Sequence, residues 1–136
     1  LIEKYTALFE IDRALNARIG SFSHGMKQKL LISASLLHEP ALWILDEPIV
    51  GLDPQSAFRL KNLMREYADL GNTVFFSTHI MEIAEKVCDK IAIINKGKIL
   101  FCGTLPELQA QRAQRGESDS LEHLFLTMTE AQEATK

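Results

Sequence analysis

A short apolar run leads into two acidic residues and a proline in the segment Ala41-Leu42-Trp43-Ile44-Leu45-Asp46-Glu47-Pro48. An uninterrupted apolar run of this length is typical of a strand covered on both faces, as in a parallel sheet. Two further apolar runs, at residues 73–77 and 91–94, follow at intervals that leave room for a helix before each. This alternation of strands and helices predicts an α/β fold with a parallel sheet.

The segments around these strands have helical patterns. Asp53-Pro54 resembles an N-cap followed by proline at the first helical position. The helix predicted after it ends at Gly71 and carries an apolar face of Leu60, Leu63, Met64 and Tyr67. Other helices are expected over residues 1–10, 12–20 (with Asp12 as cap), 26–38 and 80–87. The helix over 26–38 has an apolar stripe of Met26, Leu30, Ala34 and Leu37.

The C-terminal part is expected to hold a fourth strand and more helices. A turn at residues 95–98 leads to a strand over 99–102. Thr104 and Glu107 have the spacing of a capping box, which predicts another helix start. Residues 109–120 are polar and are expected to form a linker, and residues 121–128 have the apolar spacing of a final amphipathic helix.

Composition excludes several classes of protein. The chain has 136 residues, with 46% hydrophobic and 24% charged, and a net charge of −3. It has no basic stripe for nucleic acid and no apolar run of the roughly eighteen residues that a membrane span needs. Cys88 and Cys102 have neither metal-site nor redox-pair spacing and are expected to be reduced thiols of a cytosolic protein.

Asp46 and Glu47 form the first candidate site, because ligands of open α/β sheets bind at the carboxyl ends of strands. One carboxylate can hold a hydrated Mg²⁺ while its neighbour takes a proton from water. The alternative is the solvated start of a loop. Residue spacing alone does not decide between the two.

A second candidate is Ser23-His24-Gly25 at a helix start, where backbone N–H groups and the helix dipole favour anions. A plain N-cap is the alternative. His79 follows the second strand and would lie beside Asp46 if the two strands are neighbours, where it could bond a phosphate oxygen or serve only the structure. Gly51-Leu52-Asp53-Pro54 is locally only a turn and a helix cap.

Together, these segments resemble ABC-transporter ATPases. Phe22 to Gln28 resembles the signature motif, although His24, Phe22 and Met26 depart from its usual LSGGQ form. Residues 42–48 resemble the Walker B strand with its catalytic glutamate, residues 51–54 the D-loop, and residues 77–79 the H-loop. The form Ser-x-Gly-Met-x-Gln is similar to the bacterial export type.

The resemblance implies a partial P-loop NTPase (RecA-like) parallel sheet with part of the ABC helical subdomain. Residues 1–39 would be the C-terminal part of that subdomain, 40–104 the C-terminal part of the RecA-like core and 105–136 a helical tail. ATP and Mg²⁺ are the implied cofactors. A second ATP-binding subunit and a transmembrane permease subunit are the implied partners, at the inner face of the cell membrane.

The resemblance also assigns roles to single residues. Glu47 would act as general base and His79 would hold the γ-phosphate. Asp46 would support Mg²⁺ through water. Ser23, His24 and Gly25 would contact ATP bound by the partner subunit, and Asp53 would cross the dimer interface.

No Walker A sequence, G-x-x-x-x-G-K-[ST], occurs in these residues. We therefore expect a fragment of a longer ATPase, opening inside a helix at Leu1, that is inactive by itself. Two alternatives are an ABC-type ATPase without a membrane partner and a non-enzymatic scaffold. The transported substrate is not specified by the sequence.

Overall fold

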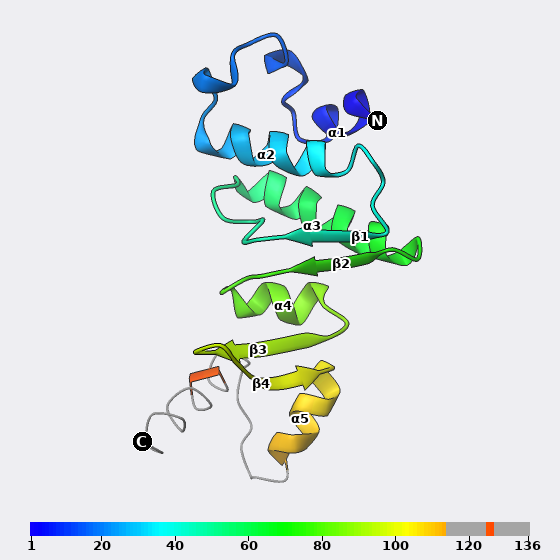
Figure 1. Cartoon of the computed structure of the whole chain (residues 1–136), viewed down its shortest axis with the longest axis vertical. Helices are drawn as coiled ribbons and strands as arrows, with labels where there is room; N and C mark the ends of the chain where they lie inside the picture. The colour runs from blue at the N-terminus through cyan, green and yellow to red at the C-terminus, as the bar shows by residue number, and fades with distance from the viewer. Residues whose placement is uncertain (114–124, 127–136) are drawn as a thin grey trace. The chain divides into compact units, whose positions relative to one another are not determined.

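The computed structural model describes residues 1–113 and 125–126, and the chain divides into two compact units, Leu1–His79 and Ile80–Lys136. Figure 1 shows the elements of each unit. This division differs from the predicted boundaries after residues 39 and 104, which stay a prediction of family subdomains. Residues 114–120 of the linker expected over 109–120 lie outside the described residues. So does the final helix expected over 121–128, apart from Phe125 and Leu126, which are helical.

The first unit combines helices with two parallel strands. Its elements are α1 (Ile2–Leu8), 3-10 helices at Asp12–Ala14 and Ile19–Ser21, α2 (His24–Ser35), β1 (Leu42–Leu45), α3 (Pro54–Asp69) and β2 (Thr73–Phe76). β1 and β2 are parallel neighbours, with Leu42 beside Thr73 and Leu45 beside Phe76. In Figure 1, α3 lies between α2 and the two strands. The predicted α/β class with a parallel sheet is confirmed.

The α3 helix covers one face of the strands. Its predicted face is confirmed, because Leu60, Leu63, Met64 and Tyr67 are all buried. The Tyr67 ring meets Trp43 of β1 edge-on at 5.6 Å, a favoured arrangement for aromatic pairs. The other face is open in the described chain, with Leu42, Ile44 and Phe75 all more than half exposed. The expectation that β1 is covered on both faces is therefore wrong for these residues.

The inward face of α2 differs from the predicted stripe. Ala34 and Leu37 are exposed, whereas Ile32, Ser33 and Leu36 are buried. The helix packs through positions 25, 28–29, 32 and 36, which follow the helical repeat but begin with glycine, glutamine and lysine. A search for apolar periodicity misses this face, because its first turns meet a loop through polar contacts.

The prediction of a helix over residues 12–20 is also wrong, since only the two short 3-10 turns form there. Ile11 and Phe22, which flank the segment, are buried, and no residue between them is buried. A short helix without a face to bury gains too little to offset the cost of nucleation.

The second unit holds α4 (Met81–Val87), β3 (Ile91–Asn95), β4 (Lys98–Gly103) and α5 (Leu105–Ala113). β3 pairs with β4 and runs antiparallel to it, so the expectation that it is a third member of the parallel sheet is wrong for the described residues. The two-residue turn between β3 and β4 explains why these two strands are antiparallel. Lys96 (φ +48°) and Gly97 (φ +75°) both have positive φ, as the tightest hairpin turns require.

The start of α5 confirms the predicted capping box. The Thr104 amide donates to Glu107 Oε2 at 2.7 Å, and the Glu107 amide donates to Thr104 Oγ1 at 3.3 Å. These bonds hold the pKa of Glu107 below its usual value. The helix runs on to Ala113, so residues 109–113, expected in a linker, are helical. None of the helices in the described ranges is long and apolar enough to cross a bilayer.

Candidate functional site

The ends of β1 and β2 bring the predicted acidic residues and histidine together. The two strands are parallel and in register, so the segments that follow them leave the sheet at the same edge. Asp46 and Glu47 follow β1, and Ser77 and His79 follow β2. The prediction that these segments share one site edge is borne out by the strand pairing.

Ser77 is the link between the two strand ends. Its hydroxyl donates to Asp46 Oδ1, and it accepts a hydrogen bond from the Glu47 amide at 3.0 Å. The Ser77 amide donates to the Leu45 carbonyl at 3.0 Å, which extends the ladder by one residue. One side chain therefore contacts both members of the acidic pair.

His79 lies against Glu47, not against Asp46 as the sequence suggested. Its Nδ1 is 2.9 Å from Glu47 Oε1, and 72% of its side chain is exposed. An ionised carboxylate only accepts, so Nδ1 carries the proton in this contact. The other ring nitrogen can then donate to an anion only when the imidazole is doubly protonated.

Glu47 adopts an uncommon backbone conformation, with φ +44°. Such a conformation in a residue other than glycine costs on the order of 1–3 kcal/mol and occurs often at functional sites. Its Oε2 atom is buried and has no hydrogen-bond partner among the described residues. A buried carboxylate oxygen left unsatisfied is suited to accept a hydrogen bond from a water or a ligand.

The acidic pair fits Mg²⁺ only in part. Asp46 is exposed, and carboxylate oxygens are the ligands that this ion prefers. Within the described residues no group of three or more His, Cys, Asp or Glu side chains forms a metal cluster. Mg²⁺ commonly takes one or two carboxylates and completes its shell with water and phosphate oxygens, so this donor set suits an ion held together with a nucleotide.

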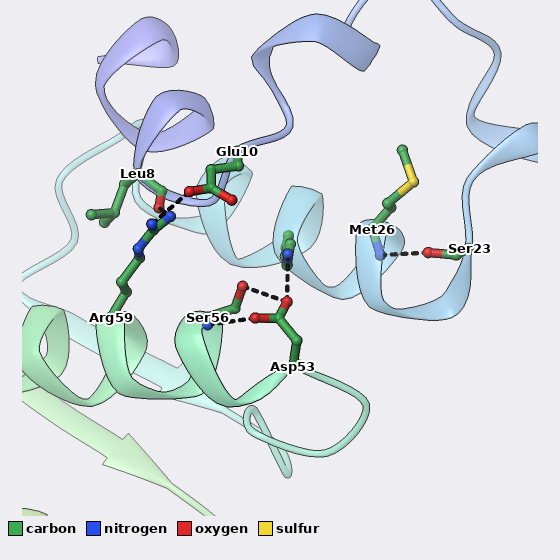
Figure 2. A network of polar contacts seen from close by, with 8 residues as sticks. Leu8, Glu10, Ser23, Met26, Asp53, Ser56 and Arg59 are labelled. Atoms are coloured by element: carbon green, nitrogen blue, oxygen red, sulfur yellow. Dashed lines mark hydrogen bonds and ion pairs between the residues drawn. The ribbon is translucent and has the colours of Figure 1, made fainter.

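The first turn of α2 has the predicted capping arrangement. Ser23 is the N-cap, and its Oγ accepts a hydrogen bond from the Met26 amide at 3.2 Å (Figure 2). Gly25 approaches the loop after β1, because a Cβ atom at this position would lie 2.8 Å from the Gly51 carbonyl oxygen. A Cβ atom on Gly51 would similarly lie 2.6 Å from Cδ2 of His24. The need for glycine at both positions follows from this contact within the chain.

Asp53 begins α3 and also contacts α2 (Figure 2). Its Oδ1 accepts from the Ser56 amide at 2.9 Å, and its Oδ2 accepts from Ser56 Oγ at 2.7 Å. Lys29 of α2 forms an ion pair with Oδ2 at 2.8 Å. The bonds from Lys29, followed by those from Ser56, hold the pKa of Asp53 far below its usual range. Both carboxylate oxygens thus have partners inside this chain.

Several contacts in this region were not expected from the sequence. Gln28 Nε2 donates to the Pro48 carbonyl at 3.3 Å, so two consecutive α2 residues contact the segment from residue 48 to residue 53. Arg59 of α3 donates to the Leu8 carbonyl at 2.7 Å and to Glu10 at 2.6 Å (Figure 2). No local sequence pattern indicates these contacts of Gln28, Lys29 and Arg59, or the bridging role of Ser77.

The chain is similar to known ATP-binding proteins in sequence and in structure. Residues 3–85 match the family described as "AAA domain, putative AbiEii toxin, Type IV TA system". The ABC-type transporter ATP-binding protein EcsA of Bacillus subtilis (strain 168) is 42% identical over 122 residues, which are 89% of this chain and 48% of that protein. A fluoroquinolones export ATP-binding protein of Mycobacterium tuberculosis (strain CDC 1551 / Oshkosh) is 36% identical over 97 residues, which are 71% of this chain and 32% of that protein.

A solved structure agrees with these relatives. The structure of an ATP-binding subunit of an ABC transporter matches with a TM-score of 0.86 and 37% identity, over 94% of this chain and 52% of that one. The chain spans about half the length of the relative EcsA and of this solved structure. With its parallel α/β fold and the motifs at its strand ends, the chain belongs to the family of ABC transporter ATP-binding proteins.

Proposed function

We propose that these residues form one side of the ATP site in an ATP-hydrolysing subunit of an export-type ABC transporter. The observation that carries this proposal is the group of Asp46, Glu47, Ser77 and His79 at one edge of the parallel strands. The fluoroquinolone export relative supports the export direction. The subunit would work at the inner face of the cell membrane against a transmembrane permease subunit, and co-purification with a multi-span membrane protein tests that partnership.

Glu47 is the proposed general base. Its orphaned Oε2 is suited to accept a hydrogen bond from the attacking water, and Oε1 is held by His79. His79, doubly protonated, would donate to a γ-phosphate oxygen through its second nitrogen. Phosphoryl transfer depends mostly on positioning and charge stabilisation, which fits a site with few reacting groups.

Asp46 is the residue that would hold Mg²⁺, through water. When bound, this ion neutralises phosphate charge and holds the phosphates in place. Asp46 is suited to it because it is exposed and because Ser77 orients its carboxylate.

Ser23, His24 and Gly25 are proposed to contact ATP bound mainly by a second ATP-binding subunit, in a head-to-tail dimer. The N-terminus of α2, a helix of 12 residues, favours an anion at this position. Asp53 is proposed to lie at the same interface. Because its carboxylate is engaged by Lys29 and Ser56, a contact across the dimer would add to these bonds or replace one of them.

The test uses the full-length subunit, meaning the gene product that contains these 136 residues together with a Walker A loop. Glu47→Gln should keep ATP binding and lower turnover by about 10²–10⁴-fold, the usual contribution of a general base. A closed dimer should accumulate with ATP in size-exclusion chromatography. Glu66→Gln, on an exposed position of α3, is the control. Near wild-type turnover of Glu47→Gln would remove Glu47 from this role.

The 136 residues by themselves are proposed to be inactive, because they contain no Walker A sequence to cradle the phosphates. Calorimetric titration of the purified chain with Mg-ATP should show no tight binding. Micromolar affinity would contradict this expectation.

A further inference from the structure

The Ser77 hydroxyl has its hydrogen bonds defined by the chemistry of its partners. The Glu47 amide can only donate, so Ser77 Oγ must accept from it at 3.0 Å. The hydroxyl proton is then available to Asp46 Oδ1, which as a carboxylate oxygen accepts it. This assignment of the proton satisfies both contacts.

The same bonds bear on the conformation of Glu47. Its positive φ is costly and persists only when surrounding contacts determine it. The bond from its amide to Ser77 is one such contact, and the bond from Oε1 to His79 is another. The Oε2 atom of Glu47 is buried and has no hydrogen-bond partner within residues 1–113 and 125–126.

We propose that Ser77 is a positioning residue for ATP hydrolysis, whose hydroxyl orients the Asp46 carboxylate and the Glu47 backbone together. This inference rests on the proposed function. Ser77 itself contacts no reacting atom in the proposed mechanism and acts through its two neighbours. Because its backbone amide is held separately by Leu45, loss of the hydroxyl leaves the strand pairing intact.

The test compares four variants in the full-length subunit. Ser77→Ala and Ser77→Val remove the hydroxyl, Ser77→Thr keeps it, and Thr and Val have nearly the same shape. Thr73→Ala, at the other end of β2, is the control for losing a hydroxyl from this strand. We expect Ala and Val to lower kcat by roughly 10–100-fold, the usual effect of removing a residue that orients ligands of a site. The KM for ATP should change less than about threefold, because Ser77 lies outside the phosphate cradle of Walker A.

A second readout does not depend on activity. Hydrogen exchange of the Glu47 amide should accelerate by about tenfold in the Ala and Val variants, as expected from the loss of one hydrogen bond. The Thr variant should restore both kcat and amide protection to within about threefold of wild type.

Each outcome decides the proposal. Unchanged Glu47 exchange in Ser77→Ala overturns the hydrogen bond, and faster exchange with unchanged kcat overturns the positioning role. A Thr variant as impaired as Val shows that shape matters instead of the hydroxyl, which also overturns it. A wild-type subunit that hydrolyses no ATP overturns the proposed function and the positioning role of Ser77 with it, and the exchange measurement then still tests the bond to Glu47.

Discussion

Asp53 allows the most detailed prediction, because it serves two structural purposes at once. It caps α3 through Ser56 and pairs with Lys29 of α2. Replacing an N-cap aspartate by alanine costs about 1 kcal/mol. The ion pair adds less than its distance suggests, since the Asp53 side chain is 49% exposed, and such pairs contribute roughly 0–1 kcal/mol.

The presence of Lys29 increases the loss in the free energy of unfolding that we expect for Asp53→Ala. Its side chain is only 14% exposed, so losing Asp53 leaves a largely buried ammonium without this partner. We therefore expect Asp53→Ala to lower the free energy of unfolding by about 2 kcal/mol in total. Asp53→Asn keeps a good cap and loses the charge, so it should cost about 1 kcal/mol or less.

Urea denaturation followed by circular dichroism is the assay, with the slope of the transition required to stay constant. Lys29→Met, which removes the ammonium and keeps the apolar stem, completes a double-mutant cycle with Asp53→Asn. The coupling energy should be roughly 0.5–1 kcal/mol. A loss in the free energy of unfolding below about 0.5 kcal/mol in Asp53→Ala would show that Asp53 contributes neither a helix cap nor an ion pair to stability. Equal losses in Asp53→Ala and Asp53→Asn would show the same of the cap.

The pH dependence gives a second check on Asp53. Its pKa is lowered in the folded state, so its ionised form stabilises the fold at every pH above the unfolded value of about 4. As the pH falls below about 4, the unfolded chain takes up a proton before the folded one does, and this contribution is lost progressively. The stability difference between wild type and Asp53→Asn should therefore shrink with acidification below that point. A difference that grows there would contradict the assignment.

Two further predictions concern packing. Gly25→Ala should lower the stability of the chain by about 1–2 kcal/mol, because a Cβ atom there would lie 2.8 Å from the Gly51 carbonyl oxygen. Gly20→Ala is the control. A Cβ atom at Gly20 would have nothing within 4 Å, so this change should leave stability unchanged or raise it slightly. Thermal melts of the two variants compare them directly, and equal melting temperatures would contradict the close approach. Leu60→Ala should cost about 2–5 kcal/mol in urea denaturation, because Leu60 is 0% exposed, and Leu31→Ala, at a 66% exposed position of α2, should cost less than about 0.5 kcal/mol. Similar losses for both would show that α3 does not form the core.

The elements predicted best are those whose pattern depends on near neighbours. The buried face of α3, the Asp53 cap and the Thr104 to Glu107 capping box follow from residues three or four positions apart. The inward face of α2 could not be predicted in this way. Its Gly25, Gln28 and Lys29 face a polar loop, so the apolar residues that a periodicity search counts lie elsewhere on the helix.

The sequence predicts where the residues of the candidate site lie, and it does not predict which of them are in contact. Asp46, Glu47 and His79 share one edge because parallel strands end together. Which residue His79 contacts depends on how the polypeptide turns after each strand. Glu47 has a positive φ and its carboxylate lies against His79, and no spacing in the sequence encodes this arrangement.

Local patterns in the sequence predict the strands, most of the helices, the helix caps and the family motifs, because each depends on backbone geometry within a few residues. Only the tertiary structure decided that Ser77 joins Asp46 to Glu47 across 31 and 30 residues, and that Lys29 pairs with Asp53. Such contacts depend on strand register and on the path of loops, which are set by packing of the whole unit. The physical reason is that a hydrogen bond tolerates only a few tenths of an ångström, while a sequence pattern specifies which face a residue lies on.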